Sequence, residues 1–324
     1  MNPDDPRQAT TSPGAAVPAG SEPESRSRSS IGIRQNTPGM LRLLRAYSWH
    51  YRQAKRWHLL KICGTLLLAA AAPAVTFWVP GAADGVAAAA GAWVLAGRTV
   101  LSLAEQRQIQ AGVTMQEQFD VDLFELDWNT SLAGPKAAAE DIADAARHIT
   151  DDRGLRDWYA STGNAPWPMD VLLCQRSSAV WGRRAHYAYG LTVAMLGSAW
   201  FLAGIIMGLV AHLSLGGYLI KLFLPSQPAF LDTIDLARSH LRQSADKQTI
   251  ELQADALWDQ GCRTPGSVTS ADCRAIQDQA YRLRRRGPRV AQWFYRSRRG
   301  RDQQAMEAAA SQLLDQFGSP GCPP

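Results

Sequence analysis

Apolar residues in this chain are concentrated in two blocks, residues 58–104 and 187–231, which are flanked by polar segments rich in arginine. Residues 187–220 contain no Asp, Glu, Lys or Arg. A helix of that length would extend about 51 Å at about 1.5 Å per residue. Because a bilayer core about 30 Å thick needs only about 20 apolar residues per crossing, each block predicts two membrane-spanning helices joined by a short turn.

The first block predicts a tight helical hairpin. Residues 62–79 form an uncharged run, and an alanine-rich run begins at Gly85. This second run must extend to about Leu103 to cross a bilayer. Only a few residues around Pro80-Gly81 separate the two runs, so the connection must be short.

The second block predicts a third span over residues 187–209 and a fourth toward Leu231. Gly204 and Gly208 form a GxxxG pattern that would allow another helix to approach closely. The fourth span must include Lys221, since 34 uncharged residues cannot make two full crossings. A re-entrant or broken helix is the alternative for this segment.

The remaining segments read as polar and helical, and no run is typical of a strand, so the predicted fold class is an all-α membrane protein with four transmembrane helices in two hairpins. Residues 1–30 have almost no large apolar side chain and predict disorder. In chain order, the predicted organisation is a disordered tail (1–30), an interfacial amphipathic helix (31–57), a transmembrane hairpin (58–104), a cytoplasmic helical region (105–186), a second transmembrane hairpin (187–231) and a cytoplasmic helical, basic tail (232–324).

The predicted interfacial helix begins with a capping signal, Thr37 followed by Pro38 at the first helical position. Apolar residues then recur at helical spacing, and basic residues form a stripe on another face: Arg42, Arg45, Arg52 and Arg56. This pattern is typical of a helix with its basic side toward lipid headgroups. An ordinary cytosolic amphipathic helix is the alternative.

Basic residues predict the orientation in the membrane. The formal net charge is +5, and the arginines cluster before the first block, at the end of the middle segment and in the tail. Neither hairpin turn contains Lys or Arg. By the positive-inside rule, both termini and the middle segment are expected in the cytoplasm.

Enzymatic signatures are absent from the sequence, which contains no phosphate loop, dinucleotide fingerprint, HExxH or GxSxG motif. The five cysteines are scattered without zinc-ligand spacing. An acidic cluster that includes Asp120 and Asp122 lacks the spacing of a calcium loop and predicts a solvated face. We therefore expect no catalytic residues, no metal site and no cofactor.

Three charges lie in or beside the expected spans: Asp84, Arg98 and Lys221. A lone charge in the bilayer core is costly, so such residues usually face a bundle interior or water, which makes these three the pore candidates. The alternative is that all three lie near span ends and extend to the membrane surface.

Several short motifs together resemble the SMODS-associated four-transmembrane effector family. They are Ile33-Arg34-Gln35-Asn36, Tyr51, Ala54-Lys55, Phe119-Asp120-Val121, Asp127-Trp128-Asn129, Leu155-Arg156-Asp157-Trp158-Tyr159, Cys174-Gln175-Arg176, Trp181, Ile276-Gln277-Asp278-Gln279 and Phe294-Tyr295. The chain departs from the family pattern at Ser178, where we expect Asn, and at Gly182, where we expect Asp.

The resemblance implies a pore-forming effector of a bacterial antiphage system. Such an effector answers a cyclic nucleotide signal, made by a cognate nucleotidyltransferase, by permeabilising the inner membrane. A constitutive channel or transporter subunit and a non-conducting membrane scaffold are the alternatives. Because four thin helices enclose too little space for a water-filled path, we expect a homo-oligomer packed partly through Gly204 and Gly208.

Two cytoplasmic stretches combine arginine with aromatic residues, as an anionic signal that carries bases would require. The preferred sensing candidates precede the third span: Trp158, Arg176, Trp181, Arg183 and Arg184. The second stretch, residues 282–301, contains nine arginines and no acidic residue. We assign it to anionic lipid rather than nucleic acid, with Arg284, Arg285 and Arg286 as contacts.

Overall fold

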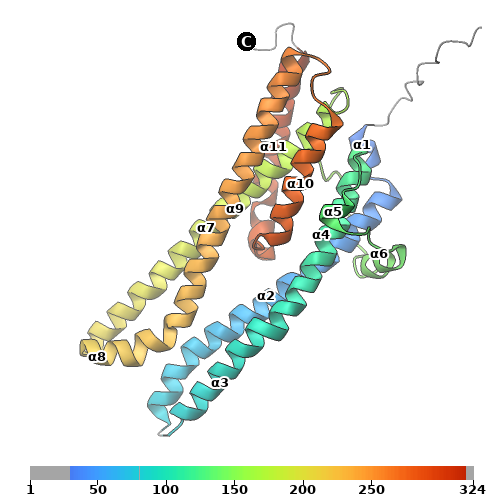
Figure 1. Ribbon diagram of the computed structural model, residues 1–324. Helices are drawn as coiled ribbons and strands as arrows, with labels where there is room; N and C mark the ends of the chain where they lie inside the picture. The colour runs from blue at the N-terminus through green and yellow to red at the C-terminus, as the bar shows by residue number, and fades with distance from the viewer. Residues whose placement is uncertain (1–29, 80, 319–324) are drawn as a thin grey trace, which may run out of the picture.

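The protein consists of a helical body from which two long helical arms extend in the same general direction (Figure 1). The computed structural model describes residues 30–79 and 81–318, and every regular element in these ranges is helical. This confirms the all-α fold class. The disorder predicted for residues 1–30 concerns a segment that lies, except for Ser30, outside the described residues. Below, the first arm is residues 58–104, the second arm is residues 187–231, and the body is the rest.

Helix α2 (Pro38–Trp78) follows the short helix α1 (Ile31–Arg34) and joins the body to the first arm. It begins at Pro38 as predicted, and it continues through residue 57 without a break. Leu44 and Tyr47 are buried in the body, where α2 contacts α4 and α6. The apolar side of the expected interfacial helix therefore packs against α4 and α6 of the body.

The return of the first arm is one continuous helical path. It comprises α3 (Ala83–Ala96), the π-helical segment η1 (Gly97–Leu101) and α4 (Ser102–Phe124), which ends in the body. Trp93 of α3 lies over Gly64 of α2, where a Cβ atom would be 1.9 Å from the indole ring. The Trp93 indole Nε1 also donates a hydrogen bond to Thr65 Oγ1 at 3.3 Å. Because Gly64 has no side chain, the Trp93 ring can pack directly against the backbone of α2.

We expect Gly64→Ala to loosen the first arm. The added methyl group must displace the Trp93 ring, and overpacking of this kind costs about 1–3 kcal/mol. Gly91→Ala is the matched control, because a Cβ at Gly91 meets nothing within 4 Å. Thermal unfolding of the purified protein in detergent measures the effect. Equal melting temperatures for the two variants would contradict the packing of Trp93 on Gly64.

The second arm is formed by α7 (Met169–Val210), α8 (Leu215–Tyr218), the π-helical segment η2 (Leu219–Phe223) and α9 (Leu224–Arg263). Helix α9 packs along α7 from the arm into the body (Figure 1). Gly190 lies against the Ala237 carbonyl, and a Cβ at Gly197 would be 2.7 Å from Thr233. The fourth segment therefore returns along α7 as one contiguous helical path through α8, η2 and α9.

Gly204 and Gly208 serve contacts within the chain. Gly208 is buried, and a Cβ there would lie 2.8 Å from the Tyr218 ring. A Cβ at Gly204 would be 3.9 Å from the Tyr218 hydroxyl. Within one chain, the GxxxG pattern accommodates the aromatic ring of the hairpin's own turn. The expectation that this pair also joins one chain to another stays a prediction.

The arms expose large apolar side chains of the kind that are buried in the core of the body. Leu67, Leu95, Leu196, Leu209 and Ile220 are each more than 60% exposed. Two helices of the described chain, Asp84–Phe124 and Met169–Val210, are long and apolar enough to cross a membrane. An apolar surface of this extent is a membrane or protein contact.

The body is closed by α10 (Ser270–Arg286) and α11 (Gln292–Gly318), with the short helices α5 (Thr130–Ala133) and α6 (Ala139–Ala146) on its surface. Helix α10 begins with a capping box between Thr269 and Asp272. The core of the body includes Phe119, Leu172 and Trp258. It positions the inner ends of all four arm helices around one centre.

Candidate functional site

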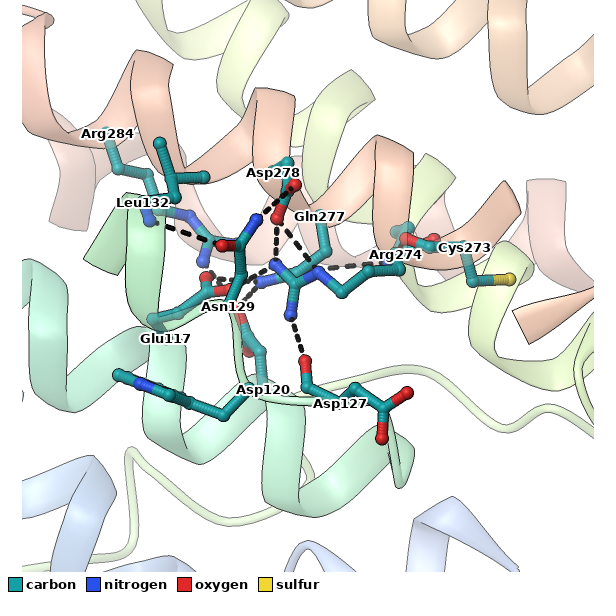
Figure 2. A network of polar contacts seen from close by, with 12 residues as sticks. Glu117, Asp120, Asp127, Asn129, Leu132, Cys273, Arg274, Gln277, Asp278 and Arg284 are labelled. Atoms are coloured by element: carbon teal, nitrogen blue, oxygen red, sulfur yellow. Dashed lines mark hydrogen bonds and ion pairs between the residues drawn. The ribbon is translucent and has the colours of Figure 1, made fainter. Parts of the chain in front are cut away.

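A buried polar network joins α4, the inward continuation of the first arm, to α10 (Figure 2). Asp120 is fully buried and forms an ion pair with Arg284. The Asp120 carboxylate also accepts hydrogen bonds from the Tyr159 hydroxyl at 2.8 Å and the Gln277 amide at 3.1 Å. The prediction that Asp120 lies on a solvated face is therefore wrong.

A second ion pair lies beside the first. Glu117 is buried and binds the Arg274 guanidinium at 2.5 Å, while Gln277 donates to the other Glu117 oxygen at 2.8 Å. Burial raises the pKa of Glu117, and the adjacent arginines partly oppose that rise. Arg274 also binds Asp278, which accepts a hydrogen bond from Asn129. Buried charges of opposite sign thus hold α4 against α10.

The network explains most of the sequence motifs singled out above, because their polar members pair with one another. Gln35 exchanges two hydrogen bonds with the Tyr159 backbone, at 2.8 and 3.2 Å. Asn36 pairs with Asp157 at 2.8 Å, and Gln175 donates to the Cys273 carbonyl at 2.8 Å. These residues organise the body.

A large cavity of about 940 Å³ lies in the body beside the inner ends of both arms. Its walls come from α2, the 148–161 loop, α7, α9 and the segment from Arg284 to Glu307. It extends to Lys55 on α2 and His186 on α7, the residues next to the two arms. Its volume is at the upper end of the range of about 300–1,000 Å³ for small-molecule sites.

The cavity wall is rich in positive charge. Six of its residues are Lys or Arg: Arg52, Lys55, Lys247, Arg284, Arg289 and Arg296. Its acidic residues are Asp151, Asp157 and Glu307, whose side chains accept hydrogen bonds from Arg153, Asn36 and Gln303 respectively. The cations of the cavity therefore outnumber the carboxylates, and these three carboxylates are engaged elsewhere.

Burial shifts the titration of these cations. Burial, together with the nearby Arg284 and Arg289, lowers the pKa of Lys247 to about 7. It also lowers the pKa of Lys55 to about 8, with Arg289 as the strongest charged neighbour. Arg284 behaves differently: although burial opposes its charge, the adjacent Asp120 holds its pKa above the ordinary value. An anion in the cavity would favour the charged form of both lysines.

Aromatic rings face the same space. Trp181 lies against Tyr295 with ring centroids 5.9 Å apart, and Trp158 lies against Tyr47 at 6.1 Å. Arg289 lies over the Tyr51 ring at 5.0 Å. The cavity therefore combines cationic groups with flat apolar surfaces, which together can bind a phosphorylated molecule that carries bases.

The structure divides the predicted sensing residues into two groups. Trp158 and Trp181 line the cavity. Arg176, Arg183 and Arg184 instead form ion pairs with Asp255, Glu251 and Asp302, respectively. These three arginines therefore attach α7 to α9 and α11.

The predicted lipid contacts are divided as well. Arg285 and Arg286 are exposed, whereas Arg284 is largely buried, lines the cavity and binds Asp120. The lipid assignment of Arg284 is corrected accordingly. The sequence stretch that we assigned to lipid thus supplies Arg284, Arg289, Tyr295 and Arg296 to the cavity.

The pore candidates lie in both arms. Asp84 is exposed in the first turn of α3, where a carboxylate is favoured by the helix dipole. Arg98 is exposed on η1, and Lys221 belongs to η2. Each arm thus has one π-helical segment that contains one basic residue, and π-helical segments are frequent at functional sites.

Two cavity residues, Lys55 and Lys247, were not among the predicted sensing residues. Lys55 belongs to a motif, so its place in the family pattern is a usable signal. Lys247 lies in a polar, charged stretch of sequence, and nothing in that stretch distinguishes it from its neighbours. Its position at the cavity depends on α9 packing against Gly182 of α7, which no local pattern encodes.

The fold and the site together define an all-helical protein with two apolar arms and a body that contains a ligand-sized cavity. Residues 29–313 match the model of the SMODS-associating 4TM effector domain, and the chain belongs to this family. It is also similar to a protein of Bacillus cereus (strain VD146) named a probable CBASS effector molecule. The two are 24% identical over 281 residues, which cover 84% of this chain and 94% of the relative. No solved structure matches the chain.

Proposed function

We propose that this protein is the membrane-permeabilising effector of a CBASS antiphage system and that a nucleotide signal switches it on. Family membership and the Bacillus relative support the antiphage and nucleotide-signalling parts of the proposal. The observation that supports a membrane action is the exposed apolar surface of the two arms. The protein acts by rearrangement rather than by catalysis.

The arrangement of the helices supports regulation of the membrane part by the body. Helix α2 runs uninterrupted from the cavity wall into the first arm, and α7 and α9 do the same for the second. A change in the cavity therefore reaches both arms through rigid elements. In this proposal, the arms form four spans in the inner membrane, both termini are cytoplasmic, and several chains assemble around a water-filled path.

We expect bacteria that produce the protein to lose membrane potential only when a cognate nucleotidyltransferase is active. A potential-sensitive dye follows the response, and a catalytically inactive nucleotidyltransferase serves as the control. Depolarisation without any signal would indicate a constitutive channel. An unchanged potential with active signalling would indicate a non-conducting scaffold. Both results would contradict the proposal.

A further inference from the structure

Three cations on the cavity wall have no carboxylate partner. Lys247 has neither a hydrogen-bond acceptor nor an ion-pair partner among the described residues, and the same holds for the buried Nε–H of Arg289. The Lys55 ammonium donates to the neutral Gln292 side chain at 2.6 Å and lies over the Tyr295 ring, 5.7 Å from its centroid. By contrast, Arg176 and Arg183 on the outer side of α7 each bind a carboxylate. The unpaired charges are therefore a feature of the cavity.

Grouping like charges away from water destabilises a protein unless something compensates for it. The lowered pKa values of Lys247 and Lys55 express this cost. Among the described residues no carboxylate pairs with Lys247 or Lys55, and the α9 carboxylates Glu251 and Asp255 bind Arg183 and Arg176 instead. A bound anion would remove the cost, and it would meet donors from several directions.

Gly182 makes room for the central cation. A Cβ atom at Gly182 would lie 2.6–2.7 Å from the end of the Lys247 side chain, so the ammonium occupies the place that a side chain on α7 would fill. Ser178 lines the cavity one helical turn earlier. Gly182 and Ser178 of α7 therefore both line the cavity, and Gly182 lies directly against Lys247.

We infer that this cavity is the receptor site for a cyclic oligonucleotide, with Lys247, Arg289 and Lys55 binding its phosphates and Trp181, Tyr295 and Trp158 packing against its bases. The inference rests on the proposed function for the origin of the ligand. The volume of about 940 Å³ leaves room for more than one base. Because Lys55, Trp181 and Lys247 belong to α2, α7 and α9, one ligand contacts the helices of both arms.

The test is direct binding to the full chain in detergent, with cyclic di-AMP, cyclic di-GMP, cyclic GMP-AMP and cyclic tri-AMP as probes. We expect at least one probe to raise the melting temperature and to bind with measurable affinity. Lys247→Gln and Lys55→Gln should each weaken binding at least tenfold. Arg242→Gln, which removes an exposed charge from the same helix as Lys247, should leave the affinity unchanged.

Aromatic and lipid controls sharpen the assignment. Trp181→Ala should weaken binding of the cyclic oligonucleotide and leave any binding of inorganic pyrophosphate unchanged, since only the former has bases. Nanodiscs with and without phosphatidylglycerol test the competing source of phosphate. If anionic lipid stabilises the protein through Lys247 and no cyclic oligonucleotide does, the inference is overturned. It is also overturned if a probe binds with equal affinity to the wild type and both lysine variants.

The depolarisation assay separates this inference from the proposed function. If Lys247→Gln folds normally and still depolarises cells in response to the nucleotidyltransferase, the site is wrong and the function stands. If a probe binds through Lys247 but signalling never changes the membrane potential, the site stands and the permeabilising function is wrong.

Discussion

Leu196→Arg should prevent stable insertion of the second arm into a membrane. Leu196 lies near the middle of the predicted third span and is 63% exposed. An arginine at the centre of a membrane helix costs about 2.5–3.5 kcal/mol on insertion scales, which also register a gain for leucine. We expect the variant to insert only through its first arm and to lose the signal-dependent depolarisation.

Leu252→Arg is the matched control for this prediction. Leu252 is 60% exposed, but it lies on the body portion of α9. The same substitution at similar exposure should leave membrane attachment unchanged, because this surface faces water in the proposed arrangement. If the two variants behave alike, the assignment of the arms to the membrane and of the body to the cytoplasm fails.

Asp120→Ala should strongly destabilise the body. The substitution leaves the Arg284 guanidinium buried without its carboxylate, and removal of one partner of a buried ion pair costs about 3–5 kcal/mol. For a domain of this size, such a loss corresponds to a fall in melting temperature of roughly 10 °C. Thermal unfolding in detergent, followed by circular dichroism, measures it.

The control lies two residues away on the same helix. Asp122 binds Lys136 at 2.8 Å on the surface, with side chains 31% and 44% exposed, and exposed pairs of this kind contribute about 0–1 kcal/mol. Asp122→Ala should therefore have little effect. The double variant Asp120→Ala with Arg284→Met should recover part of the lost stability, because it removes the unpaired charge. Equal melting temperatures for Asp120→Ala and Asp122→Ala would contradict the role of the buried pair.

The contrast between these two aspartates shows what the sequence could and could not predict. Asp120 and Asp122 belong to the same short run of alternating acidic and apolar residues. Because the local pattern does not distinguish them, both are predicted to lie on a solvated face. The partner that distinguishes them is Arg284, which is 164 residues away along the chain. Burial of a charge depends on such distant pairing, so no local signal reveals it.

The arms were more accessible to prediction than the cavity. Long uncharged runs and the short turn around Gly81 predict hairpins through hydropathy and length alone. The cavity depends on where five separate segments meet. Residues 282–301 show the limit clearly, since their composition suits lipid and nucleotide phosphate equally well. Only the packing of the body placed Arg289 inside the cavity and left Arg285 outside it.

Helices α2 and α9 each run without a break from the cavity into one arm. From Lys55 to Trp78 on α2, and from Lys247 to Leu224 on α9, the helix covers 23 residues, or about 35 Å. A rotation of about 5° at the cavity would then move the far end of either helix by about 3 Å, comparable to the small interface shifts that drive switching in other proteins. Because both helices line one cavity, a single ligand would displace the two hairpins together.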